Sequence, residues 1–412
     1  METDIDTLIH QAVFSTDENT KKQAREKIRE IAKQKGANLT SIHEYYMALG
    51  NGAVSPTSTV PAINVRMMTY DTARIIFRLM IKHNIGPIIF EIARTEMEYT
   101  DQRPDEFAVS VLAAAIKEGY VGPVFLQGDH FQLSSKRYKE DAQTEIGKIK
   151  KLIEEAISAG FLNIDIDAST LVDLSKENVD QQQIENFKTT IELTSYIRSI
   201  ENGKNISVGA EIGHIGDRNS TPEDLSAFMK GFLQAFDSNK NGISKVAIQT
   251  GTSHGGIPLP GGGIADVKLD FSAIDSIGNL CRDEYKIGGI VQHGASTLPN
   301  ELFGEFPKHK TLEIHLATGF QNIVYDKMPE ELRNEMNDWT KQNCKEEWEK
   351  DWNEEQFIYK CRKKAIGPFK QKLWELSNDQ KKPIINALYE QFEFLFEKLN
   401  TFNTKEQLLP YV

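Results

Sequence analysis

The amino-acid sequence predicts an α/β fold, a (β/α)8 TIM barrel with N-terminal and C-terminal helical extensions. Between about residues 60 and 322, a short apolar run and a helical stretch alternate eight times. Such alternation is typical of a parallel sheet, and eight units favour its closure into a barrel. Polar residues also follow several of the apolar runs, as expected at the C-terminal face of a barrel. An open, doubly wound sheet is the alternative.

The expected strands are short and apolar, and each is followed by a segment with helical periodicity. The strands are predicted at 62–65, 87–91, 124–127, 163–166, 207–211, 245–249, 289–292 and 312–316. The clearest helices between them are predicted at 71–83, 105–118, 140–159, 182–201 and 222–236. The barrel domain is therefore expected to span residues 56–325.

The two ends of the chain differ from the barrel in composition. Residues 1–55 are interpreted as a helical extension, because apolar residues recur at helical spacing before Gly36, and 50–61 is rich in glycine, serine, threonine and proline. Residues 326–412 are charged, helical and rich in tryptophan and phenylalanine. They are expected to pack on the barrel or a partner subunit, or to close over the active site. The basic run from Lys360 to Lys364 is interpreted as a solvated helix face.

Composition excludes several classes of protein. The 412 residues carry a net charge of −12, which argues against a nucleic-acid partner. No apolar run approaches the roughly 20 residues needed to cross a membrane, and the acidic N-terminus does not resemble a signal peptide. Three widely spaced cysteines favour reduced thiols. We therefore expect a cytoplasmic protein with no membrane partner.

Three histidines follow different predicted strands, and this is the strongest chemical signal. His130 follows the third strand, His254 the sixth and His293 the seventh. These ends meet on one face of a barrel, where three imidazoles can hold one zinc ion and leave a position open. Asp129 precedes His130, Glu211 ends the fifth strand, and Asp165 and Asp167 end the fourth. A single histidine at a strand end is more often structural, but three beside glycine or aspartate favour a metal.

A second signal is a group of glycines and hydroxyls near the last strands. Gly255 and Gly294 would let the backbone approach a ligand closely, and Ser296 and Thr318 add hydroxyl donors. Loops after the seventh and eighth strands often hold a phosphate in barrels. The alternative is that the glycines only form tight turns.

Six blocks in the order of the strands resemble motifs of the class II, metal-dependent ketose-bisphosphate aldolases, which act on fructose or tagatose bisphosphates. The resemblance covers residues 60–322. The blocks are Gln127-Gly-Asp-His, Ile164-Asp-Ile-Asp-Ala-Ser, Val208-Gly-Ala-Glu-Ile-Gly, Gly251-Thr-Ser-His-Gly with Lys268-Leu-Asp-Phe, His293-Gly-Ala-Ser and Ile314-His-Leu-Ala-Thr.

The resemblance implies a role for each site residue. His130, His254 and His293 would bind catalytic zinc, with Asp167 and Glu211 near the metal as alternative ligands. Asp129 would be the acid/base on the aldehyde oxygen. Gly255, Gly294, Ser296 and Thr318 would hold a substrate phosphate, with a monovalent cation or a second divalent ion as a further possibility.

The sequence departs from the family pattern at the substrate and at the base. His315 stands where the family usually has an asparagine that contacts substrate, and Ala295 and Gly319 also differ. The family's proton-abstracting glutamate has no aligned equivalent. Only Asp217 and Glu223 could substitute, and both are out of register; Asp217 is the nearest carboxylate, and His214 is its competitor. Asp217 could instead start a turn and cap the helix from Pro222.

The leading hypothesis is a zinc-dependent class II aldolase that cleaves or forms a phosphorylated ketose through a metal-stabilised enediolate. A sugar epimerase or isomerase on the same metal barrel is the second hypothesis. A non-catalytic partner subunit is the third, although the retained histidines and Asp129 speak against it. A homo-oligomer, a dimer or tetramer, is expected.

Overall fold

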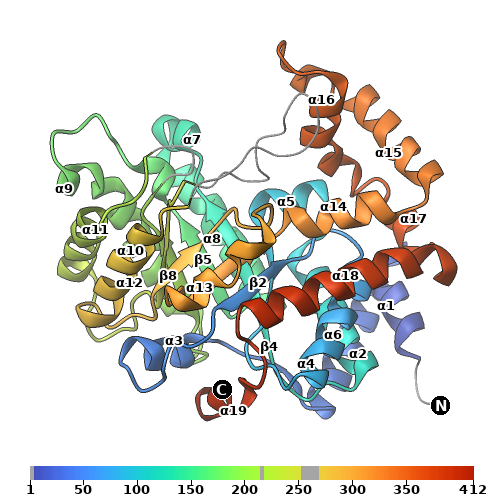
Figure 1. Cartoon of the computed structure of the whole chain (residues 1–412), viewed down its shortest axis with the longest axis horizontal. Helices are drawn as coiled ribbons and strands as arrows, with labels where there is room; N and C mark the ends of the chain where they lie inside the picture. The colour runs from blue at the N-terminus through green and yellow to red at the C-terminus, as the bar shows by residue number, and fades with distance from the viewer. Residues whose placement is uncertain (1–3, 214–217, 252–268) are drawn as a thin grey trace.

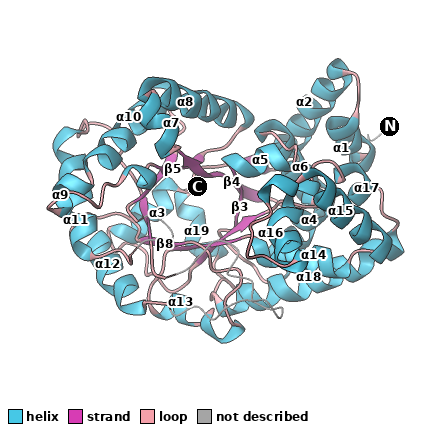
Figure 2. Cartoon of the chain, turned by 90° about the horizontal axis from the view of Figure 1, so that it is seen from above, coloured by secondary structure: helices cyan, strands magenta, loops and turns pink. Residues whose placement is uncertain are grey.

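The computed structural model describes residues 4–213, 218–251 and 269–412, and it confirms the predicted barrel. Eight parallel strands pair in sequence order, and β9 closes the ring by pairing with β2. Figure 2 shows this ring surrounded by helices. The strands are β2 (Val60–Asn64), β3 (Ile89–Ala93), β4 (Gly122–Gln132), β5 (Asn163–Asp167), β6 (Ser207–Glu211), β7 (Lys245–Ile248), β8 (Ile290–Gln292) and β9 (Glu313–Leu316).

Alternation along the strands separates an outer apolar face from a polar interior. In β5, Ile164 and Ile166 belong to the hydrophobic core, whereas Asp165 accepts a hydrogen bond from the amine of Lys245, two strands away, inside the barrel. Successive residues of a strand point to opposite sides, so a single charged residue between two apolar ones faces the barrel interior. This pattern concentrates acidic, basic and imidazole groups inside the barrel.

The five helices predicted with bounds correspond to α4 (Thr69–Lys82), α6 (Pro104–Glu118), α8 (Ala142–Ala159), α10 (Ile184–Ile200) and α11 (Pro222–Ala235). The barrel also contains α5 (Arg94–Tyr99), α7 (Ser135–Glu140), α9 (Val179–Gln182), α12 (Phe271–Asp283), α13 (Glu305–Lys308) and α14 (Thr318–Lys327). The helix predicted at 140–159 begins at Ala142, because Asp141 has an extended backbone and its side chain caps the amide of Thr144.

The N-terminal extension covers one side of the barrel and closes its floor. It contains α1 (Ile5–Phe14), α2 (Glu18–Gln34), the unpredicted strand β1 (Ala37–Leu39) and α3 (His43–Gly50). Helices α1 and α2 pack on α6, and α3 closes the floor. Strand β1 pairs with the first residues of β4. Tyr45 and Tyr46 of α3 pack with Val60, Phe125 and Leu312 at the N-terminal ends of the strands. Figure 1 shows α3 beside the C-terminal helix α19 (Lys405–Leu408), below the strands.

The C-terminal extension wraps the barrel from α14 back to its floor. It contains α15 (Glu330–Asn343), α16 (Glu354–Cys361), α17 (Lys370–Trp374), α18 (Asn378–Lys398) and α19. Helix α18 runs beside α14 and α4 (Figure 1), and the rings of Phe320 and Phe392 lie 4.5 Å apart. The boundary predicted at residues 325/326 falls inside α14. None of the helices within the described ranges is long and apolar enough to cross a membrane.

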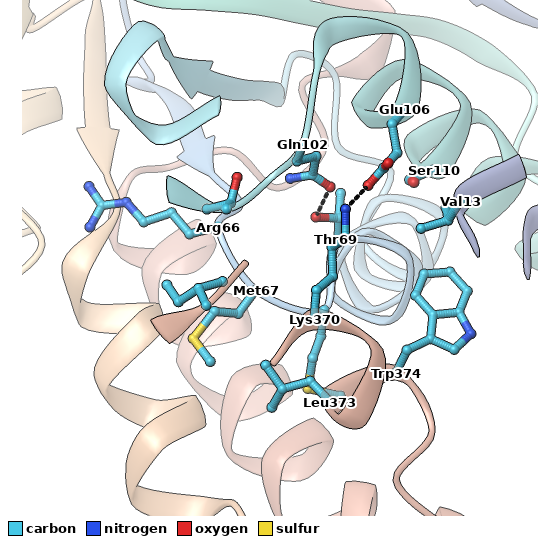
Figure 3. A pocket seen from close by; sticks show the side chains of 13 residues that line it. Val13, Arg66, Met67, Thr69, Gln102, Glu106, Ser110, Lys370, Leu373 and Trp374 are labelled. Carbon is cyan, nitrogen blue, oxygen red and sulfur yellow. Dashed lines mark hydrogen bonds and ion pairs between the residues drawn. The ribbon is translucent and has the colours of Figure 1, made fainter. Parts of the chain in front are cut away.

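Both extensions meet at Trp374 of α17. Its indole stacks on Tyr70 of α4 with 5.6 Å between centroids, and it contacts Phe14 of α1 edge-on at 5.3 Å. Figure 3 shows the pocket at this seam, where Lys370 pairs with Glu106 at 2.9 Å. Arg66 also lines the pocket, but its guanidinium points away from this pair. It instead reaches residues at the C-terminal end of the barrel.

Candidate metal centre and active site

A bulge in β4 turns Asp129 and His130 toward the C-terminal mouth of the barrel. The register with β5 shifts between Gly128 and Phe131, and His130 has a φ of 41°. A bulge places an extra residue in a strand and re-aims its side chains. Consequently two consecutive residues both serve the site. The Asp129 carboxylate lies 3.2 Å from His315, and His130 Nδ1 lies 3.3 Å from Glu211.

Three of the predicted metal-site residues converge. The potential ligand atoms of His130, Glu211 and His293 lie within 4.8 Å of one another, and the two imidazole rings are 4.2 Å apart. Two imidazoles and a carboxylate are a donor set that suits zinc. The group therefore fits a divalent cation. The third predicted histidine, His254, lies outside the described residues.

Asp167 lies against the same imidazole from the end of β5. Its Oδ2 is 3.4 Å from His130 Nδ1, and the amide and hydroxyl of Ser169 donate to its Oδ1 at 3.1 and 2.7 Å. Gln132 donates to its other oxygen. The serine of the block from Ile164 to Ser169 thus holds the aspartate in place. A carboxylate fixed in this way can orient a metal-binding imidazole.

Burial and mutual charge perturb the protonation of this group. Burial raises the pKa of Glu211 to about 7, with the neighbouring Asp167 adding to the effect. Burial opposes protonation of His130, but Asp129 and Glu211 outweigh it and raise its pKa well above the ordinary value. The site therefore holds positive charge among buried carboxylates. A divalent cation could replace these protons.

A second polar layer lies directly below, inside the barrel. His315 Nδ1 is 3.2 Å from both Asp129 and Glu91, and its Nε2 is 2.6 Å from Glu313. Lys245 donates to Glu313 at 2.6 Å and to Asp165 at 3.0 Å. Sequence reasoning missed Glu91, Lys245 and Glu313. Only Glu91 had a clear signal, because it is the single charged residue within the otherwise apolar strand β3.

The predicted phosphate residues lie after the last two strands. Gly294 has a φ of 67°, and an added Cβ at Gly319 would lie 2.5 Å from the carbonyl oxygen of Ser296. Gly319 therefore lets the start of α14 approach the loop after β8. Among the described residues, no side chain caps the N-terminus of α14, which begins at Thr318. Unpaired amides at a helix N-terminus favour an anion. Gly255, the fourth predicted residue, lies outside the described ranges.

Arg66 contacts this helix N-terminus, and a second cation, Lys363, lies near Arg66. Arg66 donates to the Thr318 hydroxyl at 3.3 Å, while its Nε donates to Glu96 at 2.8 Å. The exposed Lys363 lies near Arg66, with its amine 5.7 Å from the ring centroid of Tyr99. Desolvation and the charge of Arg66 hold the pKa of Lys363 below its ordinary value. The sequence alone did not indicate either cation as a site residue.

The basic run that contains Lys363 is anchored to α14. Arg362 stacks on Tyr325 at 4.4 Å and on Tyr359 at 5.0 Å, and it donates to Asn322 at 2.7 Å. The interpretation of this run as a solvated helix face is therefore wrong for Arg362. The aromatic rings accept its cation, and this fixes the backbone from which Lys363 projects.

The segment expected to carry the proton-abstracting base is described only from Arg218 onward. Asp217 and His214 lie outside the described residues. Helix α11 is capped by Thr221, which forms a capping box with Asp224, and Arg218 pairs with Asp224 at 2.6 Å. The alternative in which Asp217 caps this helix is wrong, because Thr221 occupies that position.

The comparisons with known proteins agree with this geometry. The family described as fructose-bisphosphate aldolase class-II matches residues 47–376. No curated protein matches the chain. A solved structure assigned as a fructose-1,6-bisphosphate aldolase from Coccidioides immitis has a TM-score of 0.54 at 18% identity, covering 88% of this chain and 99% of that one. A probable tagatose 6 phosphate kinase from Sinorhizobium meliloti has a TM-score of 0.58 at 12% identity, covering 83% and 97%. At these identities the two structures support the fold alone.

Proposed function

The chain belongs to the class-II fructose-bisphosphate aldolase family and is an aldehyde-lyase, and we propose that it is a zinc-dependent aldolase acting on a phosphorylated ketose. Fructose 1,6-bisphosphate and tagatose 1,6-bisphosphate are the proposed types of substrate. The observation that carries the proposal is the convergence of His130, Glu211 and His293 beside the buried carboxylate of Asp129.

We assign the metal to His130, His254 and His293, with Glu211 and Asp167 near it. When bound, a divalent ion supplies Lewis-acid polarisation of the ketose carbonyl. The protein's part is to keep these imidazoles in one orientation. Asp167 does so for His130, because it accepts from Ser169 and cannot rotate freely.

Asp129 is the proposed acid/base on the oxygen of the departing aldehyde. Its Oδ1 lies 3.8 Å from His130 Nε2, and only 4% of its surface is exposed. The charges of His130 and His315 outweigh burial and hold its pKa well below the ordinary value. The carboxylate is therefore ionised and able to accept the hydroxyl proton in the cleavage direction.

Phosphate recognition is assigned to Gly255, Gly294, Ser296 and Thr318 at the start of α14. The sequence also predicts His315 among the substrate contacts. Arg66 and Lys363 suit an anionic substrate, because they bring positive charge to the C-terminal mouth of a protein whose net charge is −12. Arg66 contacts Thr318 and would act at the phosphate held by this helix N-terminus, whereas Lys363 is proposed for the second phosphate of a ketose bisphosphate.

The experiment is metal analysis combined with an assay of triose phosphate release from a panel of phosphorylated ketoses. We expect about one zinc per chain and release from a ketose bisphosphate. Asp129→Asn should keep the zinc and lose roughly 100-fold in turnover, the usual scale for a general acid/base. Near-normal turnover in this variant would remove the role of Asp129. A metal-loaded protein that releases no triose phosphate would contradict the proposed substrate class.

The same panel separates the alternatives. An epimerase or isomerase would convert one ketose phosphate into another without release of a triose phosphate. A non-catalytic partner subunit would do neither. The buried Asp129 beside the converging His130, Glu211 and His293 argues against a non-catalytic role. A cytoplasmic location and a dimeric or tetrameric assembly stay predictions.

A further inference from the structure

We propose that a buried chain of hydrogen bonds runs from Tyr46 on the barrel floor, through Glu313 and His315, to Asp129, and that it positions the acid/base carboxylate. The inference rests on the proposed function only for the role of Asp129. It gives His315 a positioning role in place of direct substrate contact. It also gives the N-terminal extension a part in catalysis.

His315 has both ring nitrogens engaged by carboxylates. Nδ1 lies 3.2 Å from Asp129 Oδ1 and 3.2 Å from Glu91 Oε2, and Nε2 lies 2.6 Å from Glu313 Oε1. The side chain is buried, with 5% of the residue exposed. A substrate hydroxyl would have to displace one of these carboxylates to reach either nitrogen. The ring is better placed to bridge Asp129 and Glu313.

The orientation of the His315 ring is fixed by a second neighbour. Its plane meets the ring of His293 edge-on, with 4.2 Å between centroids and 61° between planes. An imidazole held at both nitrogens and at one edge has no free rotation. Asp129 Oδ1 is therefore held by Nδ1 of His315, and Glu313 fixes the orientation of that ring through Nε2.

Glu313 is the most firmly held residue in the chain of hydrogen bonds, because both of its carboxylate oxygens accept hydrogen bonds. Lys245 donates to its Oε1 at 2.6 Å and Gln127 donates to the same oxygen at 3.0 Å. The hydroxyl of Tyr46 donates to Oε2. None of the surface of Glu313 is exposed. With donors on both oxygens, the carboxylate cannot turn without leaving buried polar groups unpaired, which costs roughly 1–3 kcal/mol for each group.

Tyr46 links these hydrogen bonds to a segment outside the barrel strands. It belongs to α3, is fully buried, and packs at the floor with Val60 and Leu312. The ring of Tyr46 also lies 6.0 Å from the Lys245 amine. The same polar layer includes Asp165, Glu313 and His315 at metal-ligand spacing, but the Lys245 amine is already bonded to both Asp165 and Glu313. The layer is therefore better explained as a support than as a second cation site.

The orientation of the Asp129 carboxylate matters because proton transfer requires a defined geometry between the acid/base group and the substrate oxygen. A displacement of about 1 Å at a reacting group can cost roughly 100-fold in rate. Removal of the Tyr46 hydroxyl leaves all atoms of the active site in place. It removes only the hydrogen bond that helps to hold Glu313. The expected effect is a moderate loss of turnover without a change in substrate or metal affinity.

The test compares Tyr46→Phe in the wild-type protein and in Asp129→Asn. In the wild-type background we expect kcat to fall by roughly 3- to 10-fold, with KM and zinc content unchanged. In the Asp129→Asn background the same substitution should have no further effect, because the group that it positions is already disabled. Tyr45→Phe is the matched control, since Tyr45 is a buried neighbour on α3 whose ring lies 6.2 Å from that of Tyr411, and its kcat should stay normal in both backgrounds.

Each result decides a specific point. Equal losses from Tyr46→Phe in both backgrounds would indicate a general loosening of the barrel and overturn the inference, as would no loss in the wild-type background. Full turnover in Asp129→Asn would instead refute the proposed acid/base. His315→Asn adds a second measurement. We expect kcat to fall at least about tenfold with KM unchanged, whereas a raised KM with normal kcat would restore His315 as a substrate contact.

Discussion

An added Cβ at Gly128 would lie 2.4 Å from Cζ of Phe131 and 2.5 Å from its Cε1, so a larger residue in the bulge of β4 would press on this ring. Phe131 is fully buried among core residues and cannot move aside without opening a cavity. The same bulge directs Asp129 and His130 toward the site. In the short block Gln127-Gly-Asp-His, the glycine therefore makes the bulge possible, and the aspartate and histidine are the side chains that the bulge directs to the site.

Gly128→Ala should impair metal binding, because the added methyl group would press on a buried ring and distort the bulge. We expect a loss of roughly 1–3 kcal/mol in the free energy of unfolding from overpacking, together with weaker zinc binding as His130 is displaced. Thermal unfolding and zinc titration measure the two effects. Normal zinc affinity in a destabilised variant would show that the bulge does not set the direction of His130.

Gly147→Ala is the matched control for this experiment. Gly147 lies inside α8, and an added Cβ there would meet nothing within 4 Å. Alanine is favoured over glycine in a helix by about 1 kcal/mol, so this variant should be slightly more stable and should bind zinc normally. A loss of stability at Gly147 would point to a general intolerance of substitution.

Zinc affinity should rise with pH between about 6 and 8. The pKa of Glu211 is raised to about 7, and that of His130 well above its ordinary value, so both groups are largely protonated below pH 7. The zinc ion must displace these protons. For each proton displaced, zinc affinity should therefore fall by about tenfold for every unit by which the pH is lowered. Competition with a chelator at pH 6, 7 and 8 measures the slope.

Glu211→Gln provides the control for the pH dependence. The amide has no proton to lose in this range, so the variant should bind zinc more weakly at pH 8 and show a shallower slope. His130 keeps its own share of the dependence. Equal affinity at pH 6 and pH 8 in the wild-type protein would mean that these groups do not bind the ion.

Lys363→Met should raise KM for a ketose bisphosphate by roughly 3- to 30-fold, because one charged hydrogen bond to a phosphate contributes about 1–2 kcal/mol. A ketose 1-phosphate should be affected much less, since it lacks the distal phosphate. Lys364→Met is the control. The Lys364 amine pairs with Glu347 and is therefore committed elsewhere. Equal effects of the two substitutions would remove Lys363 from the substrate site.

The sequence could predict the barrel because hydrophobic runs alternate with helical stretches at every unit. It also placed His130, Glu211 and His293 correctly at strand ends that converge. In contrast, the pairing of charges inside the barrel could not be predicted. Lys245 and Glu313 begin their strands in the sequence and look like the edges of apolar runs. Only the closed barrel shows that the side chains of Lys245 and Glu313 both point into its interior and form a hydrogen bond there.

The extensions were harder to interpret for the same reason. Tyr46 precedes every barrel strand in the chain, and its contact with Glu313 joins residues 267 positions apart. Arg362 appears in the sequence within a basic run, and nothing local indicates that two tyrosine rings accept it. Helical periodicity identifies an apolar face, but it does not say which part of the molecule that face will cover.

The last prediction concerns the base that removes a proton beside the substrate carbonyl. Asp217 and His214 are the two candidates from the sequence. Thr221 and Asp224 already cap α11, so capping does not account for a carboxylate at position 217. The following residues are anchored, since the amide of Ser220 donates to the carbonyl of Gln249 at 2.8 Å and the amide of Gln249 donates to the Ser220 hydroxyl at 3.0 Å. Ser220, which follows Asp217 by three residues, is thus held at the end of β7.

Proton exchange at the carbon next to the carbonyl of the ketose-derived triose phosphate isolates this step from cleavage. We expect Asp217→Ala to lower the exchange rate by roughly 100-fold or more while zinc content and substrate binding stay normal. Arg218→Met is the local control, because it disturbs the same segment through its pair with Asp224 but removes no base. If His214→Ala abolishes exchange and Asp217→Ala does not, His214 is the base. If both variants exchange normally, the proton is removed by a group outside this segment.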